Sequence, residues 1–286
     1  MNRRAPYRYR RLTATLLLLS AFVGVSAQHE RTHSTMVGAG WASIYDTYLS
    51  PYTYHGTNVH LLRETRRPLR SPLLKTDRLT FQTLLDVDLS MVKSPARNVD
   101  EYAGGVRYSL SWLYQLPLRG RTSSTQGTDA DAAPFTLHLG PQLSAYAGGI
   151  YNDRNGNNPA QAKADLMIDF TAMGQFRFQM LRRRCTLRYQ AAIPLMGIAF
   201  SPQYGQSYYE AFTLGHRDHN VLFAHVGNMP SMRHLLTLDV PLRRSSRTTL
   251  RLGYAGEFMQ SRFNNLRYHS YTHAIMIGLT QTLNRL

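Results

Sequence analysis

Residues 164–180 read ADLMIDFTAMGQFRFQM and alternate between apolar and mostly polar side chains along their whole length. Leu166 and Ile168 share one parity, whereas Asp165 and Asp169 occupy the other. Because successive side chains of a strand point to opposite faces, the pattern predicts a strand with one apolar and one polar face. The segment is also much longer than the usual globular strand of about 5–6 residues. Long strands of this kind are typical of barrels in bacterial outer membranes.

The same alternation recurs along the chain. It predicts ten strands, at Thr35–Thr47, Asn58–Arg67, Leu79–Met91, Val106–Leu116, Phe135–Ala147, Ala164–Met180, Cys185–Phe200, Arg233–Leu242, Arg247–Gln260 and Tyr268–Asn284. Residues 208–226 could add a further pair, which would give twelve. The sequence therefore predicts an all-β protein, an antiparallel transmembrane β-barrel of the outer-membrane type with 10–12 strands.

A soluble periplasmic β-sandwich that binds a ligand is the alternative fold, because its strands alternate as well. Two features favour the barrel. The expected strands are about 11–17 residues long, whereas about 9–11 residues cross a bilayer. Their polar face also carries charged side chains, which suits a polar lumen better than a dry core.

Connection lengths test this topology, since an even number of strands places both ends of the chain on the periplasmic side. The connections at 181–184 and 243–246 are short, as periplasmic turns usually are. We expect external loops at 150–161, 201–220 and 261–267. The connections at 66–77 and 117–134 are long for the periplasmic side.

The N-terminus has the features of an export signal. Five arginines precede an apolar run from Leu12 to Val25, and the small residues of Val25-Ser26-Ala27 form a cleavage site. The apolar run is shorter than the ~20 residues of a spanning helix. We expect residues 1–27 to be removed as a signal peptide, leaving residues 28–286 as a single barrel domain in the outer membrane of a Gram-negative bacterium.

The chain is strongly basic, with 33 Lys and Arg against 17 Asp and Glu and a net charge of +16. In a soluble protein such an excess of basic residues would favour nucleic acid as the binding partner. An exported chain does not encounter nucleic acid in normal service. The expected partner is outer-membrane lipid, including lipopolysaccharide phosphates, which arginine binds in bidentate fashion. Arginines that merely extend to the membrane interface are the simpler interpretation. Cys185 is the only cysteine, which excludes an intramolecular disulfide.

Charged residues on the polar parity of the strands are the best indication of function. They are Asp86, Asp88, Arg107, Asp165, Asp169, Arg177, Arg188, Asp239, Arg251 and Glu257. The interior of a barrel of 10–12 strands is narrow, so we expect opposite charges to pair and largely close the lumen. A thin solute path is the alternative. The sequence favours a structural, adhesive or narrow-transport protein over an enzyme.

A barrel hydrolase that acts on lipid A or phospholipid remains the enzymatic alternative. Its candidate catalytic residues are Ser207, His216 and His219, since a histidine can activate a serine. No nucleophile-elbow pattern surrounds Ser207, and ordinary loop polarity explains these residues more simply. His216, Asp218 and His219 lie close together in the sequence, so they could instead bind a divalent metal. We expect no metal and no cofactor.

Three stretches carry a resemblance to a known family: YLSPYTYHG at 48–56, YGQSYYE at 204–210 followed by Leu214-Gly215, and LTLDVPL at 236–242. Together they resemble an uncharacterised, domain-of-unknown-function family of exported β-barrel proteins of Bacteroidetes. The resemblance spans most of the mature chain. It implies a β-barrel in a Gram-negative envelope and implies no activity or catalytic residue.

Overall fold

The computed structural model describes residues 31–71, 76–117, 134–156, 158–180, 182–215, 219–242 and 247–283. The predicted signal peptide, residues 1–27, and nearly all of the predicted long connection at 117–134 lie outside these ranges. In the part of the chain that is described, no helix is long and apolar enough to cross a membrane.

Strands make up most of the described chain. They are β1 (Arg31–Asp46), β2 (Thr53–Ser71), β3 (Thr76–Lys93), β4 (Asp100–Gln115), β5 (Phe135–Asn152), β6 (Ala160–Met180), β7 (Arg183–Phe200), β8 (Val221–His225), β9 (Ser231–Pro241), β10 (Thr248–Phe263) and β11 (Leu266–Leu283). A short helix, α2 (Tyr208–Phe212), lies between β7 and β8.

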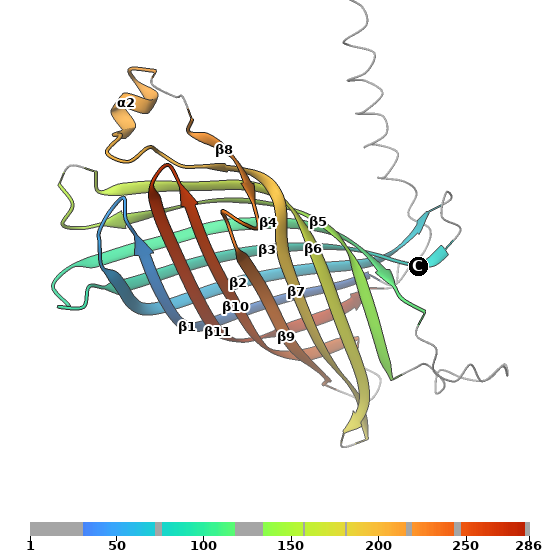
Figure 1. Ribbon diagram of the computed structural model, residues 1–286. Coiled ribbons are helices and arrows are strands. Elements are labelled where there is room, and N and C mark those ends of the chain that lie inside the picture. Colours follow the sequence, from blue (N-terminus) through green and yellow to red (C-terminus); the bar gives the residue numbers. More distant parts are fainter. Residues whose placement is uncertain are drawn as a thin grey trace, which may run out of the picture.

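The sheet closes on itself as an antiparallel barrel, because β1 pairs with β11 and β6 pairs with β7. Strand β7 pairs with β9 over one half of its length and with β8 over the other half. Strands β8 and β9 therefore share one position, and the wall has ten (Figure 1). The predicted 10–12-stranded barrel is confirmed at ten, and the β-sandwich alternative is wrong because a single sheet forms the whole fold.

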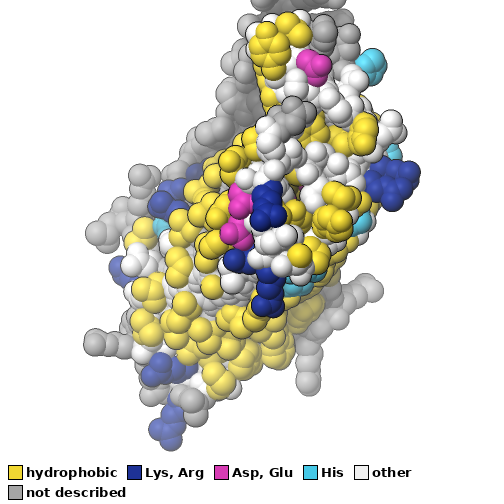
Figure 2. Space-filling view, turned by 90° about the vertical axis from the view of Figure 1, so that its left-hand side faces the viewer, with side chains coloured by type: hydrophobic (Ala, Val, Ile, Leu, Met, Phe, Trp, Pro, Cys, Tyr) yellow, Lys and Arg dark blue, Asp and Glu magenta, His cyan; other side chains and the backbone are white. Residues whose placement is uncertain are grey.

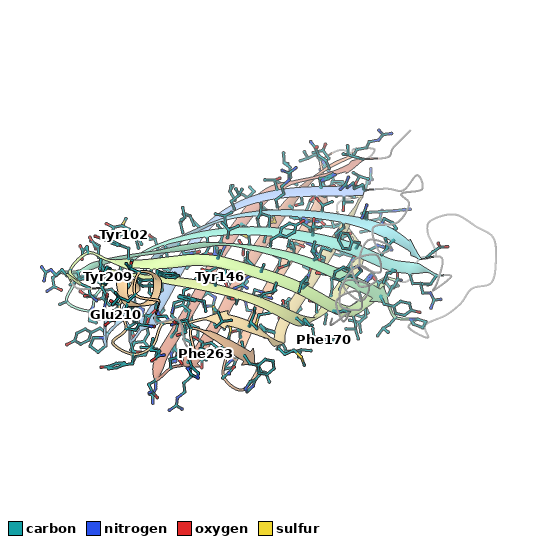
Figure 3. The ribbon with its side chains drawn as sticks, turned by 90° about the horizontal axis from the view of Figure 1, so that it is seen from above. Tyr102, Tyr146, Phe170, Tyr209, Glu210 and Phe263 are labelled. Atoms are coloured by element: carbon teal, nitrogen blue, oxygen red, sulfur yellow. The ribbon has the colours of Figure 1, made fainter. Side chains whose placement is uncertain are left out.

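The two ends of the barrel differ. We call the end at Arg31 and Leu283 the turn end, and the opposite end, at Asp46 and Leu266, the loop end. Helix α2 projects from the loop end (Figure 1). Its residues Tyr209 and Glu210 lie at the same end of the barrel as Tyr102 of β4 (Figure 3).

The alternation of β6 separates two environments, as its sequence predicts. Leu166, Ile168 and Phe170 are 44%, 48% and 43% exposed on the outer face. Asp165 and Asp169 are 7% and 0% exposed and face the lumen. Figure 2, which views the loop end, shows hydrophobic side chains spread over the flank of the barrel. Along the middle of β6 the wall is therefore apolar outside and polar inside, as in an outer-membrane barrel.

Two expected connections are instead mainly strand. The ladder between β2 and β3 continues through Arg66↔Gln82 to Leu69↔Leu79, so the predicted long turn at 66–77 is wrong. The external loop expected at 261–267 is also wrong. Strands β10 and β11 run to Phe263 and from Leu266, and two residues join them.

Asn264 and Asn265 form this two-residue connection with φ angles of 49° and 62°. Positive φ at both positions defines a type I′ hairpin turn, whose twist matches that of the flanking strands. Asparagine adopts this left-handed conformation more readily than other residues with a side chain.

We predict that Asn265→Ala lowers the free energy of unfolding by about 1 kcal/mol, because alanine is strained at positive φ. Asn265→Gly, which is free of that strain, should be at least as stable as the wild type. Guanidinium-induced unfolding of the detergent-solubilised protein measures both. Equal stability of the two variants would contradict the turn assignment.

Candidate functional site

Ion pairs cross the lumen between strands on opposite sides of the wall. With β8 and β9 sharing one position, the order around the wall is β1, β2, β3, β4, β5, β6, β7, β9, β10, β11. Strands five positions apart in this order face each other across the lumen. Three such pairs are β2 and β7, β4 and β10, and β1 and β6. Each of these three pairs of strands is joined by an ion pair.

The first pair centres on Glu64 of β2, in the half of the barrel nearer the turn end. Arg188 of β7 donates two hydrogen bonds to its carboxylate, at 2.5 and 2.7 Å. Arg251 of β10 also contacts Glu64 and donates to both oxygens of Asp239, at 2.5 and 2.7 Å. The Nε atom of Arg66 lies 3.4 Å from Glu64. Glu64, Arg188 and Arg251 are each 1% exposed, so solvent does not weaken these contacts.

The second pair joins β4 to β10 near the middle of the barrel. Arg107 lies 3.1 Å from Glu257 of β10 and 3.2 Å from Asp165 of β6. The guanidinium carbon lies 4.5 Å from the ring centroid of Tyr146, which packs beneath it. One arginine therefore holds three strands together.

A further contact reinforces the wall beside this pair. Arg233 of β9 contacts Asp169 of β6, which also accepts a hydrogen bond from Gln142 at 2.7 Å. Gln142 accepts in turn from Ser111 at 2.9 Å. Oδ2 of Asp169 and the side-chain amide of Gln142 thus have hydrogen-bond partners, whereas Oδ1 of Asp169 has none among the described residues.

The third pair lies at the loop end. Lys163 of β6 is 2.8 Å from Asp46 of β1, and its ammonium group is 3.8 Å from the ring centroid of Tyr268. An apolar cluster fills the lumen around this level. Its buried members are Ala42, Ile44, Leu49, Tyr54, Val92, Ile150, Met167, Ala199, Ala224, Met229, Met259, Phe263 and Tyr268.

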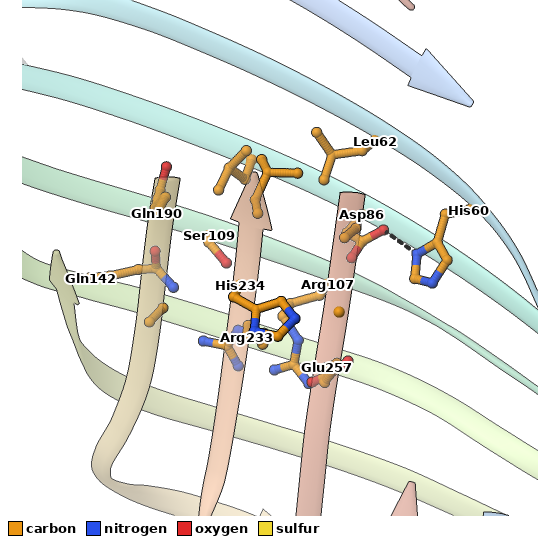
Figure 4. Close-up of a pocket in the computed structure, with 15 residues that line it drawn as sticks. His60, Leu62, Asp86, Arg107, Ser109, Gln142, Gln190, Arg233, His234 and Glu257 are labelled. Atoms are coloured by element: carbon orange, nitrogen blue, oxygen red, sulfur yellow. Dashed lines mark hydrogen bonds and ion pairs between the residues drawn. The ribbon is translucent and has the colours of Figure 1, made fainter. Parts of the chain in front are cut away.

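A cavity of about 70 Å³ lies in the middle of the lumen. His60 and Asp86 lie on one side of it, with 3.1 Å between Nδ1 and Oδ1, and Arg107, Arg233 and Glu257 lie on the other (Figure 4). A water molecule takes up about 30 Å³ in the liquid, so this cavity holds only a few. Side chains therefore occupy most of the lumen at this level.

Eight of the ten charged residues singled out in the sequence take part in ion pairs or, in the case of Asp86, in a contact with His60 inside the barrel. They are Asp86, Arg107, Asp165, Asp169, Arg188, Asp239, Arg251 and Glu257.

The two others do not. Asp88 is half-buried and forms no ion pair with any residue that the structure describes. Arg177 was expected inside the lumen and is exposed, because it lies close to the end of β6 at Met180.

Sequence analysis missed several members of the network, among them Glu64, Arg66 and Lys163. Glu64 lies on the inward parity of β2 with Leu62, while the outward parity carries both Leu61 and Arg63. Charged and apolar side chains occur on both faces of this segment, so alternation gave no signal. Lys163 and Asp46 lie close to strand ends, where loop and lumen positions look alike in the sequence.

Among the candidate hydrolase residues that the structure describes, Ser207 and His219, the contacts form no catalytic arrangement. Ser207 is the N-cap of α2, where its Oγ accepts from the Glu210 N–H at 3.2 Å and donates to Oε2 of Glu210 at 3.0 Å. His219 is exposed, and its carbonyl oxygen accepts from Asn264 at 2.9 Å. His216 and Asp218 lie outside the described residues. Over the described ranges, no group of three or more His, Cys, Asp or Glu could hold a metal ion.

Comparison with known proteins places the chain in a family without assigning an activity. The family model "Protein of unknown function (DUF3316)" matches residues 12–286. No curated protein matches the sequence.

Solved structures with a similar shape include three bacterial outer-membrane proteins. The outer membrane protease OmpT of Escherichia coli is 7% identical, with 91% of this chain and 99% of that chain covered and a TM-score of 0.48. The translocator domain of the autotransporter NalP of Neisseria meningitidis is 11% identical, with 96% and 95% covered and a TM-score of 0.38. An outer membrane channel of Pseudomonas putida F1 is 8% identical, with 91% and 97% covered and a TM-score of 0.35.

We predict that Glu64→Gln lowers the free energy of unfolding by about 3–5 kcal/mol, because it leaves the buried Arg188 without its counter-charge. Guanidinium-induced unfolding in detergent measures the loss. The matched control is Asp100→Asn, which breaks the exposed pair with Lys93 at 3.3 Å and should cost less than about 1 kcal/mol. A Glu64 variant as stable as this control would show that the cross-lumen pair does not hold the barrel together.

Proposed function

We propose that this chain, which belongs to the DUF3316 family of proteins of unknown function, is a closed, non-conducting outer-membrane barrel. Its function is to anchor the loop-end structure at the cell surface. The observation that carries the proposal is the set of three ion pairs across the lumen, together with the apolar cluster at the loop end. A cavity of about 70 Å³ between them is too small for a solute path.

The outer face supports a membrane location. Large apolar side chains on every side of the barrel are 36% or more exposed, including Trp41, Leu89, Ile198 and Ile275. A continuous apolar surface of this extent is rare on soluble monomers, whose patches rarely exceed a few hundred Å². Hydrocarbon removes the cost of exposing it.

Exposed arginines at both ends support lipid as the partner. Arg97, Arg154, Arg262 and Arg267 lie at the loop end, whereas Arg182, Arg183 and Arg184 lie at the turn end. Guanidinium groups at these levels can bind head-group phosphates above and below the apolar band.

The loop end is held rigidly, which suits a surface anchor. The hydroxyl of Tyr48 donates to the carbonyl of Gln206 at 2.8 Å and ties the β1–β2 loop to the segment before α2. Burial raises the pKa of Tyr48 to about 12, so its hydroxyl remains a donor at neutral pH. Phe200 at the end of β7 stacks on Phe212 of α2 with 6.2 Å between ring centroids.

We predict that the purified protein shows no steady ohmic conductance in planar bilayers, because the lumen is filled over most of its length. Heat-modifiable gel mobility of the same preparation reports whether the barrel is folded, and an open porin serves as the positive control. A reproducible ohmic channel from folded protein would overturn the closed-barrel proposal and favour narrow transport.

We also predict that Phe170→Arg destabilises the protein in lipid bilayers by about 2–4 kcal/mol, the cost of a cation on the lipid face near the bilayer centre. Tyr209→Arg, on exposed α2, is the matched control and should change stability little. Unfolding midpoints in vesicles of defined thickness compare the two. Equal effects would contradict the assignment of the outer face of β6 to lipid.

A further inference from the structure

A second and larger cavity lies at the loop end, outside the lumen network. Its volume is about 590 Å³, within the range of about 300–1,000 Å³ that small-molecule sites occupy. Residues of three connections form it, at 47–52, 94–99 and 153–159, with the adjoining ends of β2 and β5. These connections lie together at the left-hand end of the barrel in Figure 1.

The lining combines aromatic, amide and cationic groups and contains no carboxylate. It comprises Leu49, Ser50, Tyr52, Tyr54, Ser94, Pro95, Ala96, Asn98, Val99, Asn152, Arg154 and Asn155. Such a lining accommodates a polar ligand that is neutral or negatively charged, because the cavity itself offers no negative charge.

Part of this lining is fixed before any ligand binds. The side-chain amide of Asn152 donates to the hydroxyl of Tyr54 and to Glu101, both at 3.1 Å, and Tyr54 donates to Ser50 at 3.2 Å. Asn155 donates to the carbonyl of Leu49 at 3.2 Å and links two of the connections. Preorganised groups lose little conformational freedom on binding, which favours affinity.

Other groups remain available to a ligand. Tyr52 is 60% exposed. Asn98 accepts from Ser94 through its Oδ1 at 3.0 Å, which leaves its NH₂ group to donate. The guanidinium group of Arg154 forms no ion pair with any described residue, while its backbone N–H is held by Asn152 at 3.2 Å.

We propose that this cavity binds a pyranose sugar that carries one anionic group. An exposed tyrosine ring packs against the C–H face of a pyranose, and side-chain amides bond its hydroxyls in both directions. A carboxylate or phosphate on the sugar accepts two parallel hydrogen bonds from the guanidinium of Arg154. Uronic acids and sugar phosphates share this chemistry, and both occur as components of cell-surface polymers and lipids.

Saturation-transfer difference NMR on the full mature protein in detergent tests the proposal, since it detects millimolar binding. The probes are methyl glucuronide, glucose 1-phosphate, the neutral methyl glucoside and N-acetylglutamate. We expect saturable transfer to the ring protons of at least one acidic sugar, with about tenfold weaker binding of the neutral glucoside. The acidic sugar that binds more tightly identifies the source as carboxylated or phosphorylated.

Two variants and two controls make the result specific to the cavity. Tyr52→Ala should abolish transfer, and Arg154→Gln should lower the affinity for the acidic sugar to that for the glucoside. Tyr204→Ala and Arg97→Gln alter exposed residues of the loop end outside the lining and should leave binding unchanged. Absence of transfer from both acidic sugars, binding that survives both cavity substitutions, or equal binding of N-acetylglutamate would overturn the proposal.

Discussion

A charged side chain that is buried inside a closed barrel needs a counter-charge from the same barrel. Glu64 illustrates this constraint, because it is almost fully buried and is surrounded by three arginines, two of which are buried as deeply. An unpaired ion in such a place would cost several kcal/mol, so each of these groups depends on the others. The bidentate contact of Glu64 with Arg188 joins residues 124 positions apart in the sequence, and its single hydrogen bond from Arg251 joins residues 187 apart. These contacts can form only once the wall has closed.

The same constraint explains why arginine is preferred to lysine in this interior. A guanidinium group presents several N–H donors in a fixed plane, so Arg107 reaches Glu257 and Asp165 on two different strands at once. Lys163 reaches Asp46 alone, near the loop end, and the aromatic face of Tyr268 supplies the remaining stabilisation. Arginine thus joins strands in the middle of the barrel, where the space for water is small.

The strands and their inward faces could be predicted wherever one parity was consistently apolar, as in β6. Where charges occur on both parities, as around Arg63 and Glu64 of β2, local alternation carries no information about direction. The partners of each charge depend on the register of strands far apart in the sequence, which alternation along a single strand does not contain. The division of one wall position between β8 and β9 was equally hidden, because the connection at 226–230 interrupts the alternation.

In the closed barrel that we propose, the two ends are the surfaces on which specificity can develop. Because opposite walls are tied together, each loop is anchored to strands that cannot move independently. The barrel therefore determines the shape of the cavity formed by the connections at 47–52, 94–99 and 153–159. Asn152 shows the link directly, because it ends β5, bonds Glu101 of β4 and fixes the ring of Tyr54 on β2. Strands joined by ion pairs across the lumen are in this sense the support that a binding surface made of short loops requires.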